Sequence, residues 1–268
     1  MDVRVGSRYP FQFDSFAGFP LIHAVTTRDA ELPGEGDINI AGRLPLDEAL
    51  SNRRSWAQLI CVDAEALVCG RQVHGVEVQL VDERHRGLGA TTIETALPQT
   101  DALITQTPNL PLMIYTADCV PVIVYDPVQH ALGLGHAGWR GTVGNIAGNL
   151  VAAMQGKIGS DPADLIVKLG PSIGPCCYEV GDEVIDAWRS SGLDPDLVAV
   201  RPVVPRAHLD LWAGNRLAFE AAGVPSHQIE QSGICTRCHA DRFFSRRAGR
   251  GHRGLFATIA QLTPKIPA

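Results

Sequence analysis

The fold is decided by residues 111–142, which read PLMIYTADCVPVIVYDPVQHALGLGHAGWRGT. Two strongly apolar runs lie in this segment, Pro111–Tyr115 and Val120–Tyr125, and the polar residues Thr116–Cys119 separate them. Short apolar runs bounded by turn residues are typical of strands buried inside a sheet. The segment therefore predicts two neighbouring buried strands with polar side chains at the break between them.

The residues around these runs predict further strands and helices. His130–His136 alternates small and apolar residues, Gly138–Gly141 turns the chain, and a helix is predicted over Thr142–Gln155. Elsewhere, apolar periodicity and capping residues predict strands over Ile22–Thr27, Ala66–Val68, Val76–Val81, Ala102–Thr105, Leu165–Leu169 and Leu255–Ala260, and helices over Pro45–Cys61, Asp182–Arg189 and Asp210–Ala222. This order predicts a mixed α/β fold in a single domain over residues 1–268.

Composition narrows the class of protein. Of the 268 residues, 45% are apolar and 19% charged, which excludes a disordered chain or a coiled coil. The net charge is −6 without any Lys/Arg-rich run, which argues against a nucleic-acid partner. We expect neither a membrane span nor a secretory signal, and hence a cytoplasmic protein acting on small molecules. The seven cysteines, an odd number, fit reduced thiols.

Three potential ligands stand at polar breaks beside the apolar runs: His74, Cys119 and His136. Taken singly, each has an ordinary explanation as a hydrogen-bonded histidine or a small buried cysteine. Nearby glycines, including Gly75 and Gly138, leave room for other groups to approach closely, which favours a shared cavity. Two imidazoles and one thiolate are a known catalytic zinc set that leaves a fourth position open. Their separations of 45 and 17 residues match no local metal signature.

The same residues lie in motifs that resemble the YfiH family, also called the polyphenol oxidase or laccase-domain family. The principal matching segments are Gln72–Gly75, Ala117–Val122, His136–Gly141 and Gly170–Gly181. Weaker matches extend over nearly the whole chain and include Thr26–Arg28, Asn39, Asn52–Arg53, Cys235–Thr236 and Phe243–Ser245. The resemblance implies an α/β architecture of packed sheets flanked by helices, and zinc, or copper, held by His74, Cys119 and His136.

The resemblance also implies an activity. Members of the family are described as purine nucleoside phosphorylases that act on adenosine, inosine and methylthioadenosine and also deaminate adenosine. An older description, copper-dependent polyphenol oxidase, fits this chain less well, because multicopper oxidation needs many clustered histidines. The chain has nine histidines and no His-x-His pair. The expected partners are a purine nucleoside and phosphate, and the oligomeric state is not predicted.

Further residues are assigned roles in this reaction. Arg140 and Arg53, the latter with Asn52, match family positions and are predicted to anchor phosphate or substrate, because guanidinium groups bind phosphate oxygens bidentately. Surface ion pairs are the alternative. Asp118 is predicted to be catalytic, with Cys119 and His136, as a general base or as a partner of a ligating histidine. A solvated turn aspartate is the alternative.

Two other functions remain open at this point. In the first, Cys119 is a nucleophile and His136 its base, which would hydrolyse an amide or ester; the editing of peptidoglycan precursors would belong either to this class or to the zinc hydrolases. A thiolate that is fully occupied by zinc cannot attack freely, so metal content separates the two readings. In the second, the trio holds a structural zinc in a binding scaffold, which would need a fourth protein ligand.

Two other motifs receive no catalytic role. The pair Cys235 and Cys238 is interpreted as structural, because no second cysteine pair stands at zinc-ribbon spacing, and neither Cys176 nor Cys177 matches a metal position of the family. In the C-terminal motif the family has Phe-Phe-Ser-Tyr-Arg-Arg, whereas Arg246 directly follows Ser245 in this sequence. No role of that tyrosine therefore carries over.

Overall fold

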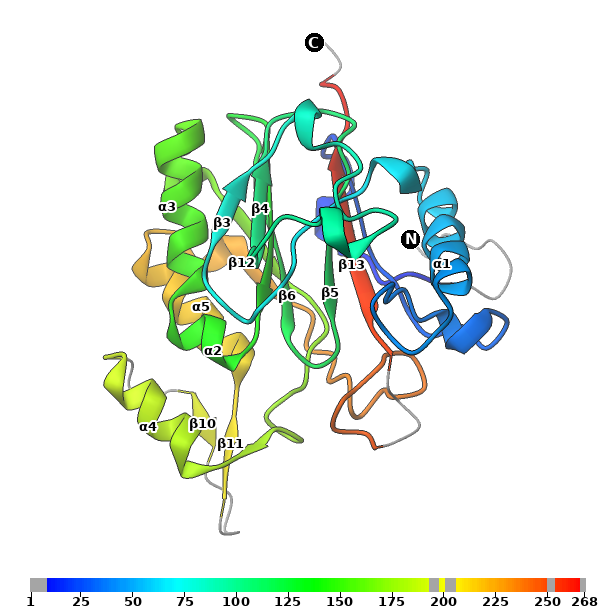
Figure 1. Ribbon diagram of the computed structural model, residues 1–268. Helices are drawn as coiled ribbons and strands as arrows, with labels where there is room; N and C mark the ends of the chain where they lie inside the picture. The colour runs from blue at the N-terminus through cyan, green and yellow to red at the C-terminus, as the bar shows by residue number, and fades with distance from the viewer. Residues whose placement is uncertain (1–8, 193–197, 201–205, 250–253, 266–268) are drawn as a thin grey trace.

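The computed structural model describes residues 9–192, 198–200, 206–249 and 254–265, and it has four layers (Figure 1). A six-stranded and a four-stranded sheet pack face to face, and helices cover the two outer faces. The larger sheet has the order β12-β8-β6-β7-β4-β3. Its strands are β3 (Val78–Leu80), β4 (Ala102–Thr105), β6 (Val120–Asp126), β7 (Ala131–Ala137), β8 (Ile166–Leu169) and β12 (Ile229–Gln231). The mixed α/β class predicted from the sequence is confirmed.

The antiparallel pair β6 and β7 forms the centre of this sheet. Its register aligns Val120 with Ala137 and Asp126 with Ala131. Every residue of both strands is buried, which accounts for their continuous apolar sequence. Alternate side chains point to opposite faces of the sheet, so Val122 and Val124 pack toward the helices while Ile123 packs toward the second sheet.

The four-stranded sheet has the order β1-β13-β5-β2. Its strands are β1 (Leu21–Val25), β2 (Val68–Cys69), β5 (Leu112–Thr116) and β13 (Phe256–Leu262). Leu112 and Ile114 face the six-stranded sheet, whereas Met113 packs on the other side with Trp56 of helix α1 (Leu46–Leu59). The predicted strand at Pro111–Tyr115 is therefore buried on both faces, as its sequence indicates.

The helix predicted over Thr142–Gln155 is two helices in the structure. Helix α2 (Trp139–Val143) ends before Asn145, and α3 (Ile146–Ile158) begins after it. Asn145 has a φ of 67°, and its side chain accepts a hydrogen bond from the Gly148 backbone N–H, which caps α3. Sequence periodicity continues across this break, so it did not reveal the left-handed residue.

The remaining elements agree with the prediction to different degrees. Helices α4 (Asp182–Ser190) and α5 (Leu211–Ala221) are confirmed, and α3 and α5 cover the six-stranded sheet. The strand predicted at Ala66–Val68 is wrong in part, because Ala64–Ala66 is a 3-10 turn and β2 starts only at Val68. Short strands that the sequence analysis missed are β9 (Glu179–Val180), β10 (Ala199–Val200), β11 (Ala207–Leu209) and β12. None of the helices among the described residues combines the length and apolar character required to cross a bilayer.

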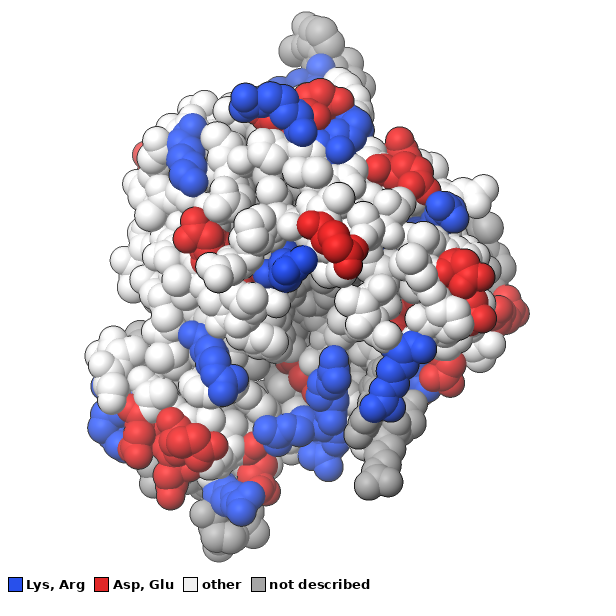
Figure 2. All heavy atoms as spheres, viewed as in Figure 1, with Lys and Arg blue, Asp and Glu red and all other residues white. Residues whose placement is uncertain are grey.

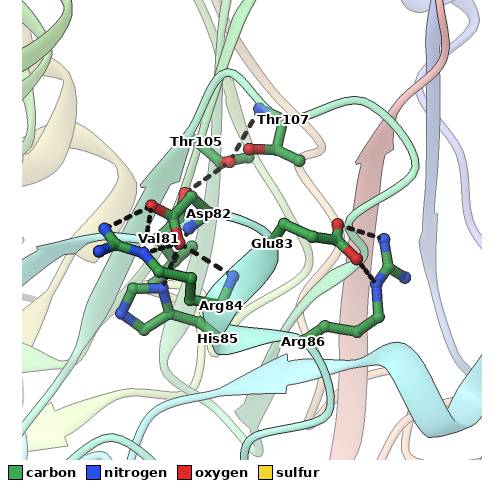
Figure 3. A network of polar contacts seen from close by, with 8 residues as sticks. All are labelled: Val81, Asp82, Glu83, Arg84, His85, Arg86, Thr105 and Thr107. Carbon is green, nitrogen blue, oxygen red and sulfur yellow. Dashed lines mark hydrogen bonds and ion pairs between the residues drawn. The ribbon is translucent and has the colours of Figure 1, made fainter.

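A polar network closes the turn that follows edge strand β3 (Figure 3). Asp82 caps the 3-10 turn Glu83–His85 and accepts hydrogen bonds from Arg84, which hold the pKa of Asp82 well below its usual range. Thr105 Oγ1 of β4 donates to the Val81 carbonyl at 2.8 Å. These contacts fasten β3 to the neighbouring strand, and the segment just before β3 carries His74.

Because His23 is buried, we expect the stability of the protein to depend on pH. Burial, and then the charge of Lys168, lower its pKa from 6.5 to about 4, and its Nε2 accepts a hydrogen bond from the Phe13 backbone N–H at 2.8 Å. The unfolded chain therefore binds the proton more tightly, so this contribution to stability is complete above pH 6.5 and is lost as the pH falls toward 4. At pH 5 we expect the loss of this contribution to lower the free energy of unfolding by about 2 kcal/mol relative to its value at pH 7.

Urea unfolding at pH 7 and pH 5 measures this effect. In a His23→Gln variant the side-chain carbonyl can still accept the Phe13 hydrogen bond but does not titrate. Its stability should fall by about 2 kcal/mol less between the two pH values than that of the wild type. Equal losses in the two proteins would contradict the prediction.

Candidate metal and active site

Three side chains from remote parts of the sequence meet at one end of the central strands. His74 Nδ1 or Nε2, Cys119 Sγ and one ring nitrogen of His136 lie within 4.8 Å of one another. The two imidazole rings are 4.8 Å apart and nearly perpendicular. His74 is exposed, Cys119 half-buried and His136 buried, so the group sits at the boundary between the core and the surface. Among the described residues, no fourth His, Cys, Asp or Glu joins this group.

The sheet topology explains why these residues meet. Cys119 immediately precedes β6, whose residue Pro121 pairs with His136 on β7. His74 lies in the loop between β2 and β3 and has a left-handed backbone, with a φ of 60°. The β6–β7 hairpin thus brings Cys119 and His136 together, and the loop between β2 and β3 adds His74.

Asp101 connects the loop of His74 to His136. Its fully buried carboxylate accepts hydrogen bonds from the backbone N–H groups of Val73, His74 and Gly75 at 3.0, 3.0 and 2.8 Å. The same carboxylate lies 2.9 Å from Nδ1 of His136. Because Nδ1 is engaged, Nε2 of His136 is the nitrogen available to a metal. The sequence analysis missed Asp101, although an aspartate directly before a buried apolar strand was a usable signal.

The charges in this group favour a thiolate. Burial alone would raise the pKa of Cys119, but the charge of His136 and hydrogen bonds from both histidines lower it to about 6. In the same pair, burial opposes the charge on His136, while Cys119 and Asp101 together raise the pKa of His136 to about 9. Without a metal, both shifts favour the thiolate–imidazolium form of the pair. A thiolate is the form of cysteine that acts as a metal ligand or nucleophile.

Gly138 provides the space in which the side chains of Cys119 and His74 approach each other. A Cβ atom at this position would lie 2.9 Å from Cys119 Sγ and 3.0 Å from His74 Cδ2. Gly141 has a similar role, because its Cβ would lie 3.0 Å from the Gly75 carbonyl oxygen. The clearance that the sequence analysis inferred from the glycines is present at both positions.

The variant Gly138→Ala is therefore expected to displace the side chains of Cys119 and His74. Because a shift of about 1 Å at a reacting centre can cost about 10²-fold in rate, we expect kcat/KM of the enzyme to fall by about that factor. Steady-state kinetics and the metal content of the purified variant measure it. The matched control is Gly156→Ala on helix α3, where an added Cβ meets nothing within 4 Å. Equal activity of the two variants would refute the role given to Gly138.

A cavity of about 410 Å³ opens over the three residues. Its volume suits a small organic molecule. Arg71 and Arg246 supply positive charge, and the wall also contains Tyr115, Ile40 and Leu255. The other lining residues are Asn39, Ala41, Gly70, Gln72, Ile93, Thr116 and Ala117, beside His74, Cys119 and His136. Figure 2 shows Lys and Arg side chains gathered in the lower middle of this face, below the connection between β5 and β6.

Asn52 and Arg53 do not reach this cavity. Both are buried, with 0% and 2% exposure. Asn52 donates to the carbonyls of Pro33 and Asp37, and Arg53 donates to the carbonyls of Ile38, Gly89 and Ala90. The Arg53 guanidinium also donates to the hydroxyl of Tyr115 at 2.7 Å. In this arrangement the Arg53 guanidinium makes four hydrogen bonds within the protein and holds a wall residue of the cavity.

Arg140 also lies outside the cavity of the trio. It lines a second cavity of about 860 Å³ together with Arg206, Arg247 and Tyr178. Its guanidinium carbon is 4.3 Å from the centre of the Trp139 ring. Burial and the nearby charge of Cys119 raise the pKa of Tyr178 to about 12. Tyr178 of the second cavity thus lies near Cys119 of the first.

Asp118 is buried, with 7% exposure, so the alternative of a solvated turn is wrong. One carboxylate oxygen accepts from Thr236 Oγ1 at 2.6 Å and the other from the Arg247 backbone N–H at 3.0 Å. Its backbone carbonyl accepts from the Ile173 N–H at 2.9 Å. These contacts fix the residue next to Cys119 to two other loops, and the carboxylate is engaged with them.

The fold and the site define a mixed α/β protein with a His–Cys–His group beneath a small-molecule cavity. The chain belongs to the family whose model is described as "Multi-copper polyphenol oxidoreductase laccase", which matches residues 46–263, and thus to the YfiH family.

The chain is similar to two relatives with different described activities. It is 41% identical over 208 residues to "Purine nucleoside phosphorylase YlmD" of Geobacillus stearothermophilus, covering 77% of this chain and 76% of that protein. It is 39% identical over 213 residues to "Adenosine deaminase RL5" of an unknown prokaryotic organism, covering 77% and 81%. The crystal structure of YlmD from Geobacillus stearothermophilus superimposes with a TM-score of 0.90 at 35% identity, covering 98% of this chain and all of that one.

Proposed function

We propose that the protein is a zinc-dependent purine nucleoside phosphorylase that also deaminates adenosine, with adenosine, inosine and methylthioadenosine as substrates. The observation that carries this proposal is the convergence of His74, Cys119 and His136 under a cavity of suitable size. The names of the relatives support the same reactions.

The donor set fits zinc. Two imidazole nitrogens and one thiolate match the three-ligand pattern of catalytic zinc sites, and the absence of a fourth donor among the described residues leaves a position for substrate or water. Gly138 provides the clearance that such close approach requires. When bound here, zinc would supply Lewis acidity, which polarises a substrate oxygen or makes a water molecule more acidic.

Other residues of the chain would position the metal ligands and bind the substrates. Asp101 orients His136, and the loop of His74 is held by the same carboxylate. Arg71 and Arg246 are the basic groups of the cavity and would bind phosphate, since guanidinium groups match phosphate oxygens in geometry. Tyr115 lines the cavity and would contact a purine base. This assignment moves the phosphate-binding role from Arg53 and Arg140 to residues that line the cavity.

The proposal is tested by incubating the purified protein with adenosine, with and without phosphate. Phosphorolysis should give adenine and ribose 1-phosphate only when phosphate is present, and deamination should give inosine in both mixtures. The variant Arg71→Ala should lose phosphorolysis more than deamination, because only phosphorolysis binds the anion. Formation of neither product would refute the proposal.

A second candidate function, hydrolysis of an amide by a cysteine nucleophile, is favoured by one observation. The charge of His136 lowers the pKa of Cys119 to about 6, as in thiolate–imidazolium pairs of cysteine hydrolases. Such an enzyme would be active after removal of metal by a chelator, whereas the zinc-dependent phosphorylase would not. An amide substrate that is turned over by the metal-free protein would therefore favour the hydrolase.

The oxidase description receives less support from the donor set. A multicopper centre needs several clustered histidines, but the described residues bring only His74 and His136 together with a cysteine. Phenol oxidation that rises in proportion to added copper would nevertheless favour this third reading.

A further inference from the structure

Four cysteines outside the candidate active site converge in the structure. Cys176 and Cys177 lie in the loop between β8 and β9, and Cys235 and Cys238 follow β12. All four sulfur atoms lie within 4.8 Å of one another. The sequence analysis found no second pair at zinc-ribbon spacing because the partner pair consists of adjacent residues, without a spacer. The structure supplies that second pair.

Two of the separations between these sulfur atoms suit a tetrahedral metal site, and all of them are within 4.8 Å. Cys238 Sγ lies 3.6 Å from Cys176 Sγ and 3.5 Å from Cys177 Sγ. Zinc–sulfur bonds of about 2.3 Å in a tetrahedron place neighbouring sulfurs about 3.8 Å apart, whereas a disulfide places them about 2.05 Å apart. The observed separations are therefore close to those around a single zinc ion.

The backbone around these sulfurs is ordered by contacts between the two loops. Ser172 and Cys235 form a parallel bridge, and the Thr236 N–H donates to the Ser172 carbonyl at 2.9 Å. The Gly174 N–H donates to Cys235 Sγ at 3.2 Å, a contact that helps to orient a sulfur ligand. A Cβ on Gly174 would lie 3.2 Å from the Trp212 ring and 3.3 Å from Cys235 Cβ, so a glycine leaves room at this point.

We propose that Cys176, Cys177, Cys235 and Cys238 form a second metal site, a closed tetrathiolate site that binds zinc. Binding of Zn²⁺ by four thiols releases four protons and leaves a site with a net charge of about −2. The Arg237 guanidinium, which donates to the Cys177 carbonyl at 3.3 Å, supplies a nearby positive charge. With no open position, this zinc has a structural role.

The second site would brace the floor of the candidate active site. Thr236, between two of the cysteines, donates to the Asp118 carboxylate, and Ile173 donates to its carbonyl. Asp118 is the neighbour of Cys119. Zinc that fastens the two cysteine loops to each other would thus also hold the backbone that positions Cys119.

The test measures zinc content and zinc–sulfur coordination in the full-length protein, independently of activity. The variant Cys119→Ala disables the first site, and it should retain one zinc per chain, with four sulfur neighbours at about 2.3 Å in X-ray absorption spectra and no nitrogen shell. The double variant Cys176→Ser/Cys238→Ser should lose this zinc. The matched control Cys61→Ser, at an exposed cysteine outside both groups, should have the metal content of the wild type.

A measurement on the wild type keeps the proposal falsifiable if the double variant does not fold. With both sites filled, the average zinc should have about 2.5 sulfur neighbours, against one if only the His–Cys–His site binds zinc. If the first site holds no zinc, the wild type should show four sulfurs around a single ion, so failure of the proposed function is distinguishable. A Cys119→Ala protein without zinc, or a thiol titration of the denatured protein that reveals disulfides among these cysteines, would overturn the proposal.

Discussion

Cys119→Ala is expected to lower kcat/KM for adenosine by at least about 10³-fold in both phosphorolysis and deamination. The substitution removes one of the three proposed ligands and the only cysteine of the group, and a catalytic metal typically contributes several kcal/mol of transition-state stabilisation. His74 and His136 alone would hold zinc weakly. Steady-state kinetics with metal analysis of the same preparation measure the effect.

The control for this substitution is Cys69→Ala, which removes a buried cysteine that packs in the core beside helix α1. That variant should lose some stability but keep its metal and its kcat. Full activity of Cys119→Ala would eliminate both the zinc-dependent phosphorylase and the cysteine hydrolase. Loss of activity with full zinc content in the first site would instead indicate a nucleophilic cysteine.

Asp101→Ala is expected to lower zinc affinity at the first site by about 10- to 100-fold, the range observed when partners of ligating histidines are removed. It should also lower the free energy of unfolding by about 3 kcal/mol, because three backbone N–H groups and the His136 imidazole lose their acceptor. Asp101→Asn should also lower the zinc affinity and the free energy of unfolding. The NH2 group of the asparagine would face N–H donors and could not accept their hydrogen bonds. Zinc titration with a chromogenic chelator and urea unfolding measure the two effects.

Asp126→Ala provides a matched control. Asp126 is another fully buried aspartate, at the far end of β6, whose carboxylate accepts from the backbone N–H groups of Val128 and Gln129. This variant should be destabilised but should bind zinc like the wild type. If both variants lost zinc equally, Asp101 would act only through stability and would have no specific role in positioning the ligands.

The central strands were predictable because their signal is local. Residues of β6 and β7 are buried on both faces, so the apolar runs mark them directly. The break between α2 and α3 was not predictable, because it depends on one left-handed residue, Asn145, within a continuous helical pattern. The strands β9, β10, β11 and β12, of two or three residues each, were missed because so short a segment carries no measurable period.

The candidate site was predictable only in part. The glycines near His136 indicated a cavity, but the partners of Asp101 lie 26–35 residues away in sequence, so its central position required the structure. The burial of Arg53 was not predictable, because a charged residue is usually at the surface. Its guanidinium is instead surrounded by backbone carbonyls from segments as distant as Ala90, and no local pattern shows such contacts.

His136 lies on β7, Cys119 directly precedes β6 and the loop of His74 is held by Asp101, whereas several walls of the cavity come from segments that contribute none of these groups: Asn39–Ala41, Ile93 and Leu255. This separation allows selectivity to evolve without rebuilding the chemistry. A mutagenesis library confined to these positions would be expected to redistribute turnover among nucleosides while every member keeps the same metal stoichiometry.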